Sequence, residues 1–239
     1  MQPDGETTVA LAPAPRRELV EAAHVLAGLG LVTAYGHVSA RSGAHMIITP
    51  AADLAIVTES RLVDVPLDTR RLPSGAPAEA WLHLALYRAR PDACSIARAQ
   101  PAAALAAAAA VTALTPAPGR PALRPVHGQA AWLGESVPVH DSAHLLRSAD
   151  LAADAASSLP SGEALLLRGN GAVTLGATPG VAVARMWLLS AACDIWLTAT
   201  GAGEVTPLTA AEIASWRAAG DELLPRLWQH LRRRVAGGE

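Results

Sequence analysis

One segment of the chain, residues 79–101, constrains the fold more than any other. Residues 79–90 have the pattern of a helix, which ends at the turn Arg90-Pro91-Asp92. A short apolar run follows, as in a buried strand, and Pro101 then occupies the first position of an alanine-rich helix predicted over 101–111. Helix, turn, buried strand and helix in direct succession indicate a domain in which strands and helices alternate.

The rest of the chain continues this alternation. Apolar residues recur on one face of an amphipathic helix predicted over 16–29, which Gly28 and Gly30 end. Further elements are predicted as strands over 37–41, 45–49, 123–126, 164–167 and 172–175, and as helices over 143–157, 180–200 and 209–233. Because some strands pair as hairpins, we expect an α/β domain of three α/β/α layers with a central mixed or antiparallel sheet.

Length and composition exclude several classes of protein. The chain has 239 residues, enough for one large domain over 16–239, preceded by a loose, flexible tail over 1–15. All 19 basic residues are arginine, and a net charge of -2 gives no reason to expect nucleic acid or a membrane surface as a partner. Without a signal peptide or a membrane span in its pattern, the protein is expected to be cytoplasmic. Cys94 and Cys193 have neither metal-ligand nor redox spacing and are expected to be core residues.

Several blocks of residues resemble the class II aldolase/adducin family. They are Glu79 followed four residues later by His83, Tyr87-Arg88-Ala89-Arg90-Pro91-Asp92, Gly36-His37-Val38-Ser39-Ala40-Arg41, Ile48-Thr49-Pro50, residues 123–139 and residues 165–171. The resemblance covers roughly 16–216 and implies a fold like that of fuculose aldolase. It is nearer to the branch of aromatic-acid decarboxylases than to the sugar-phosphate aldolases. It also implies a homotetramer with sites between subunits.

The departures from the family pattern fall on one site. In the family, two histidines of a His-x-His-Pro motif and a third in Asn-His-Gly bind a catalytic divalent metal. Arg98, Gln100 and Asn170 stand at those three positions here. An arginine carries a fixed positive charge that repels a divalent cation, and the amides are poor replacements for imidazole. We therefore expect no metal at the family's position, and no cofactor.

The resemblance also implies roles for particular residues. The family's acid/base glutamate matches Glu79, so Glu79, His37 and Arg98 are predicted to be catalytic. The residues predicted to bind substrate are Ser39, Arg41, Gln100, His127 and Asn170. Structural alternatives stay open: Arg98 could merely neutralise Glu79, His37 could be a hydrogen-bonded structural histidine, and Arg41 could be a solvated charge. His83 is expected to be structural.

These features predict a metal-independent lyase. The expected reaction is C–C cleavage, such as decarboxylation, or proton transfer and dehydration next to a carbonyl. A small carboxylated or polyketide-like molecule from bacterial specialised metabolism is the expected substrate; Ala51-Ala52 in place of the family's Ser-Gly argues against a sugar phosphate. One alternative is a non-catalytic, adducin-like binding or scaffold protein. Another is a metal-dependent decarboxylase whose metal site is rebuilt from His37, Glu79, His83 and His127.

Overall fold

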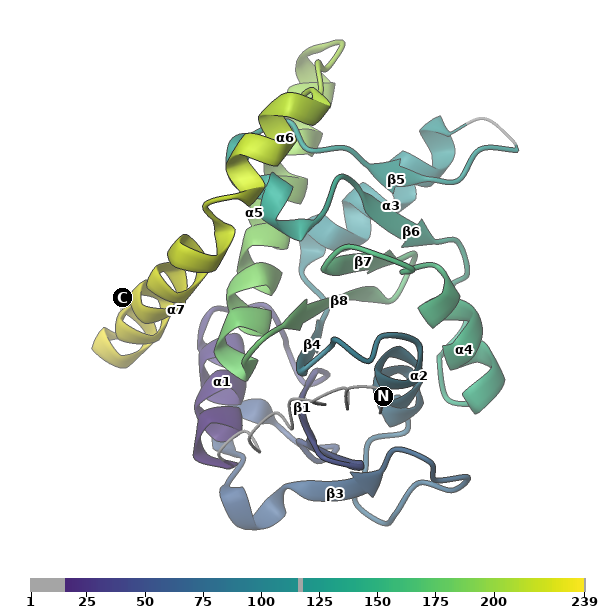
Figure 1. The fold of residues 1–239 in the computed structure, drawn as a ribbon, viewed down its shortest axis with the longest axis vertical. Helices are drawn as coiled ribbons and strands as arrows, with labels where there is room; N and C mark the ends of the chain where they lie inside the picture. The colour runs from purple at the N-terminus through teal and green to yellow at the C-terminus, as the bar shows by residue number, and fades with distance from the viewer. Residues whose placement is uncertain (1–15, 116–117, 239) are drawn as a thin grey trace, which may run out of the picture.

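Eight strands form one mixed sheet in the computed structural model, which describes residues 16–115 and 118–238 (Figure 1). Their order is β3-β2-β1-β4-β8-β7-β6-β5. The strands are β1 His37–Ser42, β2 His45–Ile48, β3 Val63–Pro66, β4 Ser95–Ala99, β5 Ala122–Leu123, β6 Val137–His140, β7 Ala164–Leu167 and β8 Gly171–Gly176. Strands β6 and β7 are parallel, and the other described pairs are antiparallel. The predicted tail over 1–15 lies outside the described residues.

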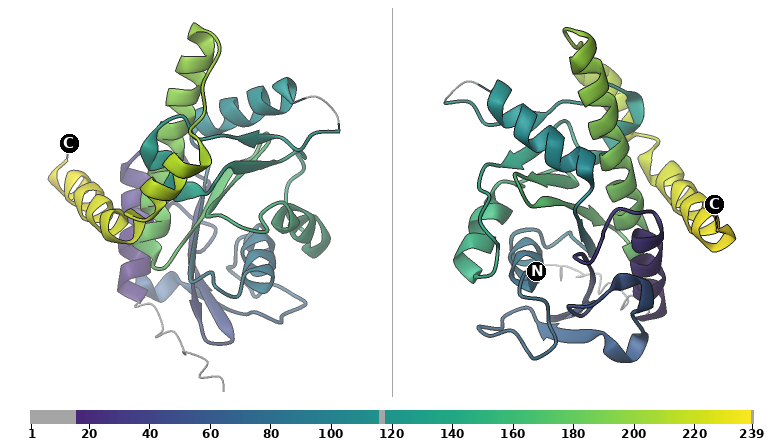
Figure 2. Two further views of the ribbon diagram at one scale, coloured as in Figure 1. Left: turned by 45° about the horizontal axis from the view of Figure 1, so that its top comes forward. Right: turned by 180° about the vertical axis from the view of Figure 1, so that it is seen from behind.

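Helices cover both faces of this sheet and complete three layers (Figure 2). Helices α1, α3 and α5 pack on one face, with α7 against α1 and α5, while α2 and α4 pack on the other. The helices are α1 Arg16–Gly28, α2 Ala80–Ala89, α3 Ala102–Leu114, α4 Ala149–Ser157, α5 Pro179–Ala202, α6 Ala210–Arg217 and α7 Gly220–Gly237. The predicted three-layer α/β architecture with a mixed sheet is confirmed.

The pleat of the strands separates two apolar cores. On β4, Ala97 and Ala99 belong to the core under α1, α3 and α5, whereas Ile96 belongs to the core under α2 and α4. Arg98 lies two residues after Ile96 and therefore shares its face. His37 of β1 is the direct cross-strand partner of Arg98. The sheet thus places both side chains on the α2 side, at one end of adjacent strands.

Several predicted boundaries were wrong. The helix predicted over 143–157 begins only at Ala149, because the Ser148 hydroxyl accepts from the backbone N–H of Leu151 and caps it there. The helix predicted over 209–233 is two helices, α6 and α7, separated before Gly220, which packs against Trp132. The strand predicted over 123–126 shrinks to β5, since Pro125 has no N–H for a ladder.

Helix α5 is the longest apolar segment of the described chain. Its length and composition would suffice to cross a membrane, since an 18-residue stretch of it has a mean hydropathy of 1.4. However, 56% of that stretch is buried within the protein. Its buried residues include Val183, Met186 and Leu189, which belong to the larger core. It is therefore a core helix.

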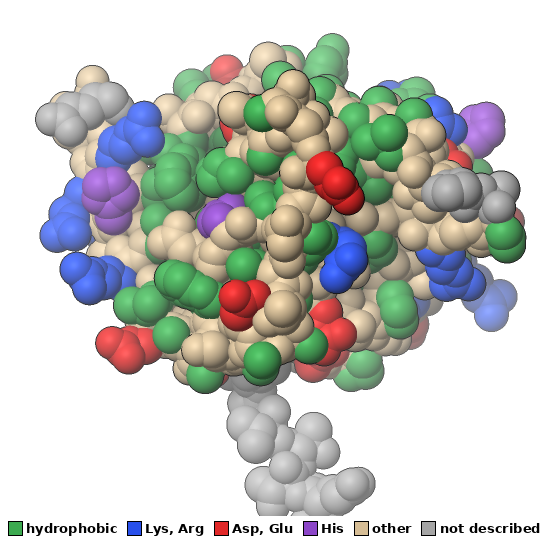
Figure 3. Space-filling view, turned by 90° about the horizontal axis from the view of Figure 1, so that it is seen from above, with side chains coloured by type: hydrophobic (Ala, Val, Ile, Leu, Met, Phe, Trp, Pro, Cys, Tyr) green, Lys and Arg blue, Asp and Glu red, His purple; other side chains and the backbone are tan. Residues whose placement is uncertain are grey.

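Figure 3 shows the end of the molecule near α6, where hydrophobic side chains lie across the surface with acidic and basic side chains between them.

Candidate active site

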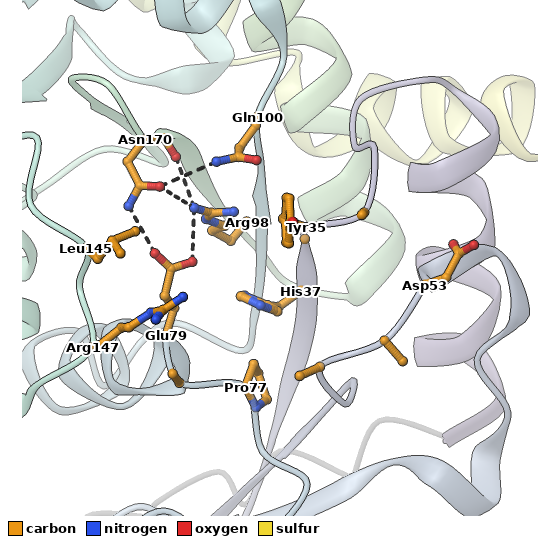
Figure 4. A pocket seen from close by; sticks show the side chains of 15 residues that line it. Tyr35, His37, Asp53, Pro77, Glu79, Arg98, Gln100, Leu145, Arg147 and Asn170 are labelled. Atoms are coloured by element: carbon orange, nitrogen blue, oxygen red, sulfur yellow. Dashed lines mark hydrogen bonds and ion pairs between the residues drawn. The ribbon is translucent and has the colours of Figure 1, made fainter.

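A pocket of about 610 Å³ opens at the end of the sheet where four segments of the chain meet. The segments are the start of β1, the end of β4, the β7–β8 turn and the start of α2, and they contribute His37, Arg98, Asn170 and Glu79 respectively (Figure 4). Gln100, directly after β4, joins the same wall. The structure therefore brings together five of the eight residues predicted from the sequence.

Glu79 begins helix α2 but does not cap it. It occupies the N-cap position, yet its side chain accepts no hydrogen bond from the backbone of the helix. The carboxylate turns instead toward the sheet, where Asn170 Nδ2 donates to Oε1 at 3.0 Å and Arg98 Nη2 lies 3.0 Å from Oε2. The side chain retains 12% exposure and faces the pocket. A hydrogen bond and an ion pair thus fix a carboxylate that a small molecule can reach.

Arg98 is a buried guanidinium held by several acceptors. It is only 2% exposed, and its Nη2 donates to Asn170 Oδ1 at 2.5 Å and to the Asn170 carbonyl at 3.2 Å, besides pairing with Glu79. Burial lowers the pKa of Arg98, which the charge of Glu79 partly restores. Because Arg98 points onto Glu79, the geometry favours the neutralising pair that was left open as an alternative.

Asn170 links the members of this network. Its amide oxygen accepts from Arg98 and, at 3.5 Å, from Gln100 Nε2, while its Nδ2 donates to Glu79. Two glycines with positive φ flank it, Gly169 at 70° and Gly171 at 94°. A Cβ on Gly171 would stand 2.2 Å from the Ala99 carbonyl oxygen. Only glycine lets the turn approach β4 this closely, which is what brings Asn170 to Arg98.

His37 lines the pocket as a neutral imidazole. Burial, helped by the nearby His83 and Arg98, holds the pKa of His37 well below its ordinary value of 6.5. Its Nδ1 has no hydrogen-bond partner among the described residues, and its ring stands edge-on to His83, with 5.8 Å between ring centroids. A neutral imidazole next to a fixed carboxylate can accept or relay a proton.

His83, Ser39 and Arg41 lie behind the pocket wall. The Ser39 hydroxyl is bonded to His83 Nδ1 at 2.7 Å and to the Tyr87 hydroxyl at 2.9 Å, and burial lowers the pKa of His83 to about 3. Arg41 donates to the carbonyls of Ala93 and Tyr87 and stacks over the Tyr87 ring. Ser39 and Arg41 therefore tie β1 to α2, and this geometry gives no support to the prediction that they bind substrate.

His127 also lies away from this site. It precedes the short 3-10 helix Gly128–Leu133 and is not among the residues that line the pocket. Within residues 16–115 and 118–238, no three His, Cys, Asp or Glu side chains come together as a metal-binding group. The set His37, Glu79, His83 and His127 is therefore not assembled into a rebuilt metal site.

Tyr35, Leu145 and Arg147 are among the pocket residues that were not predicted from the sequence. Tyr35 precedes β1 in a loop, and the other two lie in 143–148, which was predicted as helix. The side chains of Tyr35 and Leu145 are 68% and 55% exposed. The one available signal was Ser148, a favoured N-cap residue followed by Asp150 in the first turn, which would have placed the preceding residues in a loop.

The fold and the site define a class of protein. A family model for the class II aldolase and adducin N-terminal domain matches residues 17–197, and the chain belongs to this family. A relative in Arthrobacter keyseri, 3,4-dihydroxyphthalate decarboxylase, is 31% identical over 216 residues, which cover 83% of this chain and 84% of the relative.

Solved structures share the fold. YgbL from Escherichia coli superposes with a TM-score of 0.71 at 24% identity, covering 84% of this chain and 97% of its own. L-fuculose 1-phosphate aldolase from Glaciozyma antarctica has a TM-score of 0.73 at 20% identity, covering 99% and 96%. At these identities the likeness establishes the architecture alone.

The residues present do not fit the divalent metal that the family resemblance implies. The ligand positions hold a guanidinium and two carboxamides, and Arg98 already places a positive charge 3.0 Å from the one carboxylate of the set. A second cation beside it would be repelled, and none of the three ligand positions carries an imidazole. Any chemistry at this site therefore has to come from its own side chains.

Proposed function

We propose that this chain is a metal-independent lyase that acts on a small carboxylated molecule by C–C cleavage, including decarboxylation, or by proton transfer and dehydration next to a carbonyl. One observation carries the proposal. The Glu79 carboxylate is oriented by a hydrogen bond from Asn170 and an ion pair with Arg98, faces an open pocket, and has the neutral imidazole of His37 in the same wall. The small-molecule ligand, a homotetrameric assembly and a role in bacterial specialised metabolism belong to the same proposal.

Glu79 would act as the base. Its Oε1 accepts one hydrogen bond and its Oε2 forms an ion pair with Arg98, so the carboxylate keeps lone pairs for a proton from substrate. The Arg98 guanidinium stabilises the negative charge of the waiting carboxylate, so Arg98 positions Glu79 and does not itself contact substrate. His37, neutral in the folded protein, would pass a proton to or from the other side of the reacting carbon or oxygen.

Gln100 would stabilise the charge that develops on the substrate oxygen. Of the three residues at the family's ligand positions, Arg98 and Asn170 are committed to the network, while the Gln100 amide makes one long contact of 3.5 Å. Its Nε2 carries a second N–H, which is free to donate to a carbonyl oxygen in the pocket. Such a donor stabilises an enolate or carbanion as it forms.

The decarboxylase relative supports a lyase, because it shares the family and 31% of the aligned residues. Turnover would be tested by incubating purified protein with a panel of hydroxybenzoates and β-oxo acids in deuterated buffer. NMR would report release of bicarbonate and exchange of hydrogen next to the carbonyl. We expect turnover that survives dialysis against a chelator and that Glu79→Gln reduces by about 10²-fold or more. Loss of turnover on chelation would contradict the metal-independent mechanism.

A non-catalytic binding protein is the second candidate, and the Glu79–Arg98 pair favours it. Each charge neutralises the other, an arrangement that a pocket used only for binding would tolerate. If panel members shift the melting temperature of the protein but none is turned over or exchanged, this second function is the better description. Turnover that Glu79→Gln abolishes would exclude it.

A further inference from the structure

Arg147 differs from every other charged residue that lines the pocket. Arg98 and Glu79 bind each other, and Asp53, at the opposite edge in Figure 4, accepts from the backbone N–H of Ala55 at 2.9 Å. The Arg147 side chain has no hydrogen bond or ion pair with any other described residue. It lines the same pocket as Glu79 (Figure 4). The pocket therefore contains one guanidinium, that of Arg147, whose charge no described carboxylate neutralises.

The loop around Arg147 fixes the backbone from which this side chain extends. Leu146 is 1% exposed and anchored in the core under α2 and α4, so its neighbours Leu145 and Arg147 project away from that core. The Arg147 N–H donates to the Leu145 carbonyl at 2.8 Å, and Ser148 then caps α4. Because the turn is anchored, a ligand that binds Arg147 has to order the side chain but not the backbone.

Two apolar side chains accompany this cation. Tyr35 and Leu145 are among the large hydrophobic residues that the protein exposes, and both line the same pocket as Arg147. In Figure 4 they lie on opposite sides of the Glu79–Arg98 network. Exposed apolar side chains that face one another across a polar site are suited to an apolar, planar ligand body.

We infer that Arg147 binds a carboxylate that the substrate keeps through the reaction, and that Tyr35 and Leu145 hold the unsaturated body that carries it. This inference deepens the proposed function and rests on it. An arginine stabilises a carboxylate by charge-assisted hydrogen bonds, and loss of that carboxylate as carbon dioxide would forfeit them in the transition state. The group on Arg147 is thus a recognition group, while bonds change beside Glu79 and His37.

Calorimetric titration of the full-length protein with benzoate and with benzamide tests the binding step without requiring turnover. We expect Arg147→Gln to weaken benzoate binding about tenfold or more and to leave binding of the uncharged benzamide unchanged. Arg70→Gln is the matched control, because Arg70 is exposed and does not line this pocket. Equal benzoate affinity in Arg147→Gln and the original chain would overturn the inference, as would an equal loss in Arg70→Gln.

Two further measurements separate this inference from its alternatives. With a substrate from the turnover panel, Arg147→Gln should raise KM at least tenfold while kcat changes less than threefold, and the product should retain a carboxylate. Sedimentation of Arg147→Gln should match the original chain. A change of oligomeric state with unchanged benzoate affinity would place Arg147 in an interface between copies and overturn its role in recognition. Failure of Glu79→Gln to affect turnover would instead overturn the proposed function alone.

Discussion

Arg98 Nη2 stands 3.0 Å from Glu79 Oε2, and the two residues come from different elements, the end of β4 and the start of α2. The pair crosses the junction between sheet and helix layer, and Asn170 closes it from the β7–β8 turn through contacts to both partners. Because the Arg98 side chain is only 2% exposed, water cannot solvate its charge if Glu79 is removed. The ion pair therefore connects the sheet to helix α2 and also lines the pocket.

Removing one partner should cost more stability than removing both. Glu79→Gln leaves the Arg98 guanidinium buried without a counter-charge, and we expect the free energy of unfolding to fall by about 3–5 kcal/mol. Combining it with Arg98→Met should recover most of that loss, as measured by urea denaturation. Asp92→Asn, which removes the largely exposed partner of Arg90, should cost less than about 1 kcal/mol. Additive losses in the double variant would contradict the coupling.

Restoring imidazoles should create the ligand set that the chain lacks. Arg98 and Gln100 lie two apart at the end of one strand, and Asn170 reaches both from the neighbouring turn, so three side chains there converge on one point. The triple variant Arg98→His, Gln100→His, Asn170→His should bind about one Zn²⁺ per chain, whereas the original chain should bind much less. Elemental analysis after gel filtration would measure both. Equal zinc content in the two proteins would contradict our account of the site.

Acid should destabilise the fold through His83. Its pKa is about 3 in the folded protein and about 6.5 when unfolded, so between these values the unfolded state binds more protons. The free energy of unfolding should therefore fall as the pH drops below about 6.5, with His83 contributing up to about 1.4 kcal/mol per pH unit. His37 acts in the same direction.

His83→Gln should make that decline shallower between pH 6 and pH 5, as denaturation at each pH would show. Ser39→Ala is the control, because it removes the hydrogen bond to His83 Nδ1 and leaves the titrating ring. It should lower stability at every pH without flattening the slope. An identical slope in His83→Gln and the original chain would contradict the assignment.

Gly171→Ala should damage the site through the backbone. The added Cβ meets the Ala99 carbonyl oxygen at 2.2 Å on a backbone with φ of 94°, so the turn must move and carry Asn170 away from Glu79. We expect a loss of about 3 kcal/mol or more, together with weaker ligand binding. Gly43 also has a positive φ, of 59°, but a Cβ added there would meet no atom within 4 Å. Gly43→Ala should therefore lower the free energy of unfolding by about 1 kcal/mol. Equal losses would show that strain, and not the clash, is responsible.

The layers and the pocket residues at the ends of strands and of helix α2 could be predicted from the sequence. The pocket residues in loops could not. Glu79, Arg98 and Asn170 lie in short motifs whose spacing fixes their position in the fold, so their convergence could be expected. Tyr35 and Arg147 lie in loops, where no periodicity marks a direction, and the helix prediction over 143–157 concealed that Arg147 belongs to a loop. Ser39 shows the same difficulty, because a serine that connects two elements has the same side chain as one that binds a ligand. Only the fold reveals that its partners are His83 and Tyr87.

The Glu79–Arg98–Asn170 network also affects how the site matures. Its members are ordinary side chains that reach their partners when α2, β4 and the β7–β8 turn pack together, so the network is complete once the chain has folded. The free concentration of a metal does not enter that equilibrium, whereas a metal centre ties site assembly to ion supply and to competing ligands. On the proposed metal-independent function, the protein would be active in a cell compartment whatever its content of transition metals.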